Sequence, residues 1–128
     1  MTRIESRKLG VVEGFDITAH LVPDTDSSID DYEECVYTDE QRSAYLRDEW
    51  NYVGTEAVAS RAGVELGSAV IFGQEYGLFP GHERWLSPLD GEGDQFANGY
   101  GPDLIDEAIT EAKATIKKIL DCEEAVNW

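Results

Sequence analysis

The sequence predicts an α+β protein in which an antiparallel sheet of three or four strands carries two helices packed on one face. Three observations predict this class. Residues 15–22 alternate between apolar and polar side chains, residues 50–72 hold two β-type runs around a hairpin signal, and residues 101–120 carry an apolar stripe at helical spacing. A chain of 128 residues suits one domain, 1–128, with one hydrophobic core.

The first strand is expected at residues 15–22. One side of this run is apolar, namely Phe15, Ile17, Ala19 and Leu21. Pro23 ends the strand because proline donates no backbone hydrogen bond. The residues that follow, 24–37, are rich in carboxylates and poor in apolar side chains, so we expect an acidic, solvated loop.

A first helix is expected from Asp39 to Glu49. Thr38 and Gln41 have the spacing of a capping box, in which each side chain bonds the other residue's backbone amide. Asp39 and Glu40 then fall in the first turn, where the helix dipole favours negative charge.

Two further strands are expected at Trp50–Ala59 and Val64–Phe72, joined by the turn residues 60–63. We expect four apolar residues of the second run to share one face, namely Val64, Leu66, Val70 and Phe72. The next stretch, 73–101, contains seven glycines and two prolines without a sustained period. It is expected to be a long loop with one helical turn around His82–Leu86.

The last helix has the strongest pattern. It follows Gly101 and Pro102, and its apolar stripe comprises Leu104, Ile105, Ala108, Ile109, Ala112, Ile116, Ile119 and Leu120. Acidic residues lie in its first turns and lysines toward its end, in agreement with the helix dipole.

The formal net charge is −17, and it is unevenly distributed. Residues 1–23 are neutral overall, whereas residues 24–49 carry ten acids against Arg42 and Arg47. This concentration predicts a field that attracts a basic partner, and it disfavours direct binding to nucleic acid or to an anionic membrane. Without a signal-like or membrane-length apolar run, the chain is expected in the cytoplasm, with Cys35 and Cys122 as reduced thiols.

No motif predicts catalysis, a cofactor or a metal. The acids that begin at Asp24 imitate a calcium loop, but Ile29 occupies the position of the required glycine and Cys35 that of the bidentate glutamate. His82 and Glu83 are not followed by the second histidine of a zinc-peptidase motif. We therefore expect a protein that is not an enzyme.

Candidate partner-binding residues fall into two groups. The acidic group comprises Asp24, Asp26, Asp30, Asp31, Glu33, Glu34, Asp39 and Glu40. The aromatic group lies in the glycine-rich stretch and comprises Tyr76, Phe79 and Trp85. Exposed rings of this kind are natural anchors for a protein partner, and the alternative is that they fold back to cover the sheet.

Three segments resemble small uncharacterised acidic proteins encoded by tailed phages and actinobacterial genomes. They are residues 48–54, residues 65–69 and residues 72–76, so the resemblance covers roughly 38–76 together with the final helix. Small acidic phage proteins include inhibitors of host defence, among them anti-CRISPR and anti-restriction proteins that imitate DNA. For a phage-encoded chain, the resemblance therefore implies an anti-defence role in the host cytoplasm.

Three functional hypotheses follow. The first is an acidic inhibitor that mimics DNA and occupies the nucleic-acid channel of a basic host defence or DNA-processing protein. The second is a halophile-adapted or phage accessory domain without DNA mimicry, whose charge would be spread over all surfaces. The third is a small ligand-binding or hydrolytic domain that uses the 73–101 loop and therefore needs a concave pocket with convergent polar groups.

Overall fold

The computed structural model describes residues 3–83, 85–91 and 96–126. Four strands form one antiparallel sheet in chain order: β1 (Glu5–Val12), β2 (Phe15–Pro23), β3 (Trp50–Arg61) and β4 (Val64–Gly77). Helix α1 (Asp39–Leu46) precedes β3, and helix α2 (Gly101–Val126) follows β4. The expected α+β class is therefore confirmed, and the sheet has four strands where three or four were expected.

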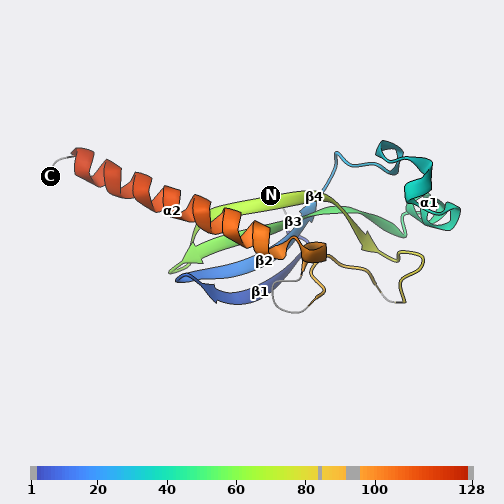
Figure 1. Ribbon diagram of the computed structural model, residues 1–128, viewed down its shortest axis with the longest axis horizontal. Coiled ribbons are helices and arrows are strands. Elements are labelled where there is room, and N and C mark those ends of the chain that lie inside the picture. The colour runs from blue at the N-terminus through green and yellow to red at the C-terminus, as the bar shows by residue number, and fades with distance from the viewer. Residues whose placement is uncertain (1–2, 84, 92–95, 127–128) are drawn as a thin grey trace.

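Helix α2 lies across one face of the sheet, over β3 and β4 (Figure 1). Its buried stripe includes Leu104, Ala108 and Ala112, as the helical period predicted. The helix lies close to the sheet at Gly67 of β4, where an added Cβ would lie 2.2 Å from the backbone oxygen of Ala108. Only glycine therefore allows α2 to sit at this distance from the sheet.

The main core fills the space between α2 and the sheet. Strand β2 contributes Phe15, Ile17, Ala19 and Leu21 to it, as its alternation predicted. At the edge of this core, the guanidinium of Arg7 donates to the carbonyl oxygens of Leu89 and Gly91, each at 2.6 Å. These bonds tie the segment after β4 back to strand β1.

A second hydrophobic cluster forms at the end of the sheet beside α1 (Figure 1). Trp50 and Tyr52 of β3 pack there with Ala44 of α1, and the indole Nε1 of Trp50 donates to the backbone oxygen of Gln41 at 2.9 Å. The capping box of Thr38 and Gln41 is present as expected. The two helices thus cover different apolar clusters, and α1 ends at Leu46, before the expected Glu49.

Several local expectations differ from the structure. Strand β1 was not predicted, because its sequence ESRKLGVV is mostly polar and lacks a clean alternation. Strand β4 continues to Gly77, so the loop starts later than residue 73. The described residues around His82–Leu86 contain no helical turn, and Leu86 instead forms a bridge with Gly77.

The four apolar residues expected on one face of β4 are divided between two faces. The register shifts between Ala59 and Ser60, so that Ala59 pairs with Gly67 and Ser60 with Glu65. This irregularity places Leu66 against the main core, whereas Val70 and Phe72 are 40% and 47% exposed. A bulge shifts the alternation of a strand by one residue, which the apolar pattern alone does not reveal.

Candidate functional site

The acidic segment is folded against the second hydrophobic cluster instead of being a featureless loop. It contains two short 3₁₀ helices, Ile29–Asp31 and Glu34–Val36. Ile29 is only 3% exposed, and the rings of Tyr32 and Tyr37 pack against the cluster around Trp50. Three apolar contacts therefore hold the carboxylates between them in a defined arrangement.

Six aromatic rings meet where this segment packs on the sheet: Tyr32 and Tyr37 from the segment, and Tyr45, Trp50, Tyr52 and Phe79 from outside it. Tyr32 stacks on Tyr52 with ring centroids 5.7 Å apart, and the hydroxyls of Tyr37 and Tyr52 lie 3.1 Å apart. Burial raises the pKa of both Tyr37 and Tyr52, so these hydroxyls stay protonated. Burial also raises the pKa of Glu75, which pairs with Tyr52 across β3 and β4.

Asp24 has a structural role inside the segment. Its carboxylate accepts hydrogen bonds from the backbone amides of Asp26 at 3.1 Å, Ser27 at 3.0 Å and Gly73 at 2.7 Å. Burial alone would raise the pKa of Asp24, but the bonds from Ser27, Gly73 and Asp26 outweigh burial and lower it. Asp24 therefore anchors the segment to β4, and its oxygens are not directed at a partner.

Asp31 is also engaged within the segment. Its carboxylate accepts from the backbone amide of Ser28 at 2.9 Å, which completes a capping box on the first 3₁₀ helix. The outward carboxylates with exposed residues are Asp26, Asp30, Glu33, Asp39 and Glu40. The side chain of Glu34 lies outside the described residues.

The three aromatic candidates occupy different environments. Phe79 packs against Trp50, with ring centroids 4.9 Å apart, and so belongs to the second hydrophobic cluster. Tyr76 packs against the main core and donates to Glu5 at 2.9 Å. Trp85 meets Tyr76 edge-on at 5.4 Å and keeps 49% of its surface exposed. The structure therefore brings Tyr76 and Trp85 together and leaves Phe79 apart.

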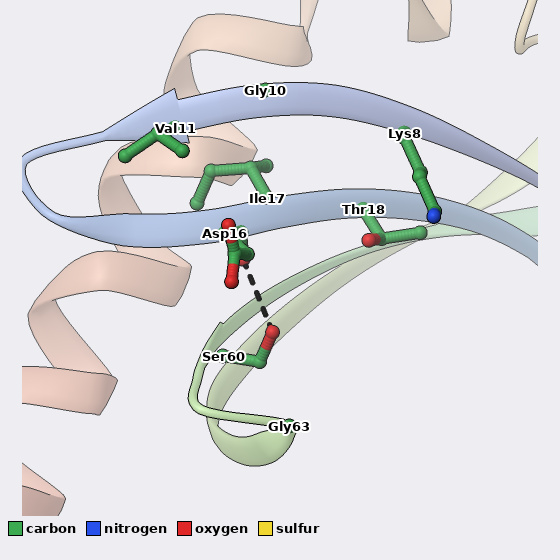
Figure 2. Close-up of a pocket in the computed structure, with 8 residues that line it drawn as sticks. All are labelled: Lys8, Gly10, Val11, Asp16, Ile17, Thr18, Ser60 and Gly63. Carbon is green, nitrogen blue, oxygen red and sulfur yellow. Dashed lines mark hydrogen bonds between the residues drawn. The ribbon is translucent and has the colours of Figure 1, made fainter.

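A hollow of about 370 Å³ opens between the two hairpins, near their turns (Figure 2). Its polar lining includes Lys8, Asp16, Thr18 and Ser60. The Ser60 hydroxyl donates to the backbone oxygen of Asp16 at 3.4 Å, which is the dashed line in Figure 2. The Ser60 hydroxyl thus bonds a backbone oxygen instead of the Asp16 carboxylate or the Lys8 amine, and a hydroxyl needs such a base as its hydrogen-bond partner to become a nucleophile.

Sequence reasoning missed a polar cluster on the sheet because it missed β1. The guanidinium of Arg3 lies 3.2 Å from Glu56 and 2.8 Å from Glu65. Beside it, His20 Nδ1 and Ser6 Oγ lie 2.6 Å apart, as a directly opposed pair on β1 and β2. Burial, followed by the nearby charge of Arg3, lowers the pKa of His20, so this imidazole favours its neutral form.

Residues 3–83, 85–91 and 96–126 contain no group of three or more His, Cys, Asp or Glu side chains placed to hold a metal ion. Cys35 and Cys122 are both exposed free thiols. None of the described helices has the length and apolar character needed to cross a bilayer.

Comparisons of this chain with protein-family models, with curated proteins and with solved structures gave no match.

Proposed function

We propose that this protein is a non-catalytic binding protein that presents the outward carboxylates of residues 24–40 to a basic protein partner. One observation carries the proposal: the most acidic stretch of the chain packs its own Tyr32 and Tyr37 against Trp50, Tyr52 and Phe79 and is tied to β4 through Asp24. A charged surface that is already ordered loses less conformational entropy on binding than a flexible loop would. Its field also accelerates encounter with a basic surface.

In its most specific form, the proposed activity is inhibition by DNA mimicry. The outward carboxylates would then stand in for phosphates in the nucleic-acid channel of a host defence or DNA-processing protein. We leave Asp24 and Asp31 out of this set because Asp24 accepts a hydrogen bond from the backbone amide of Gly73 in β4, and one oxygen of Asp31 accepts from the backbone amide of Ser28. The proposed contact set is therefore Asp26, Asp30, Glu33, Asp39 and Glu40.

Two features support binding over the other hypotheses. In the hollow of Figure 2 the Ser60 hydroxyl bonds the backbone oxygen of Asp16 and not a side-chain base, so this hydrogen bond gives a hydrolytic role no support. Adaptation to high salt would distribute acids over the whole surface, whereas residues 1–23 are neutral overall. The concentration of charge at one end of the sheet favours a directed interaction.

The test compares two variants of equal net charge. The first changes the five proposed contact acids to Asn or Gln and keeps Asp24 and Asp31. The control neutralises five exposed acids elsewhere: Glu13, Asp16, Asp90, Asp106 and Asp121. Each protein is used to capture partners from an actinobacterial lysate at low salt, and the affinity for the captured basic protein is then measured.

We expect the first variant to lose at least about tenfold in affinity, the control to stay within about threefold, and binding to weaken with salt. Duplex DNA should displace the partner if the protein mimics DNA. Equal losses in both variants, or an affinity that is unchanged by salt, would contradict the proposed site.

A further inference from the structure

Strand β4 has an unpaired outer edge. The strand order places β4 at one side of the sheet, where it pairs only with β3. Among the described residues, its one other strand contact is the bridge between Gly77 and Leu86 at its C-terminal end. The backbone donors and acceptors on the outer side of residues 65–76 therefore have no strand partner in the described chain.

The middle of this edge lacks the usual protection against strand addition. Natural proteins protect edge strands with charged residues, prolines or bulges. Strand β1, at the other edge, carries Glu5, Arg7 and Lys8 and a register shift before Gly10. Strand β4 also has two register shifts with β3, but they lie on either side of residues 67–71, which pair in regular register and contain no charged residue and no proline. This five-residue stretch of the β4 edge is thus open to another strand.

The face of β4 turned away from α2 is apolar beside this edge. Val70 pairs with Glu56, on the face opposite to Ala69 and Ile71 of the main core, and it is 40% exposed. Phe72 is 47% exposed, and its ring lies over Gly54, where an added Cβ would be 2.7 Å away. A strand placed beside β4 would meet apolar side chains on this face.

The face under α2 is acidic beside the same edge. One hollow of about 230 Å³ at the β4 edge beside α2 is lined by Val70, Ile71, Tyr100 and Leu104 together with the carboxylates of Asp103 and Glu107. Its apolar walls suit the aliphatic stem of a lysine or arginine, and its carboxylates suit the charged head.

A second hollow, of about 150 Å³, lies further along the edge and is lined by residues 65–68 and Glu111. Glu65 already pairs with Arg3 at 2.8 Å. Within the described residues, no ion pair is formed by Asp103, Glu107 or Glu111.

We propose that β4 is a docking edge for an extended segment of a partner protein whose side chains alternate between apolar and basic. Successive side chains of a strand point to opposite faces. An alternating segment added to β4 would therefore place its apolar side chains beside Val70 and Phe72 and its Lys or Arg side chains in the two acidic hollows. Backbone hydrogen bonds supply affinity, and the two unlike faces supply specificity.

Charge favours a basic partner over a second copy of this chain. Antiparallel pairing of two β4 edges would put both α2 helices on the same face of the joined sheet, with Asp103 and Glu107 of each copy near the shared seam. Such pairing would add repulsion to a chain whose formal net charge is already −17. This surface goes beyond the proposed function, because it does not use the acids of residues 24–40.

The test uses a short synthetic peptide of alternating Val and Lys with blocked ends, titrated at about 150 mM NaCl to limit nonspecific attraction. The double variant Glu107→Gln with Glu111→Gln is compared with Asp106→Asn with Asp121→Asn, which removes the same charge from exposed positions of α2 that line neither hollow. We expect the first variant to bind the peptide roughly threefold to tenfold more weakly, and the second to bind it like the native protein.

Two further measurements report on the backbone. Amide hydrogen exchange should slow in residues 66–72 when the peptide binds, and a peptide with N-methylated backbone amides should not bind. The proposal is overturned if both α2 variants lose affinity equally, if the N-methylated peptide binds as well, or if sedimentation shows that two copies occupy the edge. The variant in which Asp26, Asp30, Glu33, Asp39 and Glu40 are neutralised should still bind the peptide. A β4 edge that does not bind the peptide would therefore leave the proposed function of those acids untouched, and the reverse also holds.

Discussion

Replacing Gly67 with alanine tests how closely α2 is seated on the sheet. Gly67 is buried on β4, and an added Cβ would lie 2.2 Å from the oxygen of Ala108 and 2.4 Å from the nitrogen of Ala112. Both are backbone atoms of the helix, so no side-chain rotation relieves the overlap. The helix must move away from β4 for the methyl group to fit.

The size of the effect follows from this distance. Comfortable contact between non-bonded heavy atoms is about 3.5 Å, so α2 has to retreat locally by about 1 Å. A gap of that size removes roughly a quarter to a half of the dispersion energy between the separated surfaces. We expect Gly67→Ala to reduce the free energy of unfolding by about 3 kcal/mol, the upper part of the range for overpacked cores.

Gly54→Ala is the matched control, because Gly54 is also a buried strand glycine. Its added Cβ would lie 2.7 Å from the ring of Phe72. That ring is 47% exposed and can rotate away, so we expect Gly54→Ala to reduce the free energy of unfolding by about 1 kcal/mol. In a protein that also carries Phe72→Ala, the ring is absent and the reduction should be smaller. Urea denaturation followed by circular dichroism measures each change. Equal losses for the two glycine variants, or a Gly67→Ala protein as stable as the native one, would refute the argument from backbone contact.

Two further substitutions test the end of the sheet beside α1. Trp50→Ala should cost about 3 to 5 kcal/mol in thermal or urea unfolding, since Trp50 is 1% exposed in the second cluster; a loss below about 1 kcal/mol would contradict its central place there. Asp24→Asn should make stability less sensitive to acid. Hydrogen bonds hold the pKa of Asp24 below its ordinary value despite burial, so its contribution is present above about pH 4 and is lost as the pH falls through the folded-state pKa. Identical acid unfolding curves for the native and Asp24→Asn proteins would contradict that role.

Elements with a clean local period were predicted well. The alternation from Phe15 to Leu21 identified β2, and the stripe from Leu104 to Ala112 identified the buried face of α2. The capping box at Thr38 located the start of α1. In each case the signal comes from residues within a few positions of one another, so it can be read along the chain.

Strand β1 and the division of β4 required tertiary information. Strand β1 lies at a sheet edge and buries little, so its polar sequence carries no strong period. Its pairing nonetheless brings Ser6 opposite His20, and Arg3 within reach of Glu56 and Glu65. The bulge that turns Leu66 and Val70 to different faces arises from the pairing with β3, which no local pattern records.

The candidate surfaces show the same division between local and long-range information. Composition alone located the acidic segment at residues 24–40, because charge is a property of each residue. Only the folded chain distinguishes Asp24, whose carboxylate bonds Gly73 49 positions away, from Asp26 and Asp30, whose residues are exposed. The β4 edge likewise depends on which strands pair, and the acidic hollows beside it depend on how closely α2 rests on Gly67. Local chemistry thus determined the class and the charge, whereas contacts between distant residues decided which groups are left exposed for a partner.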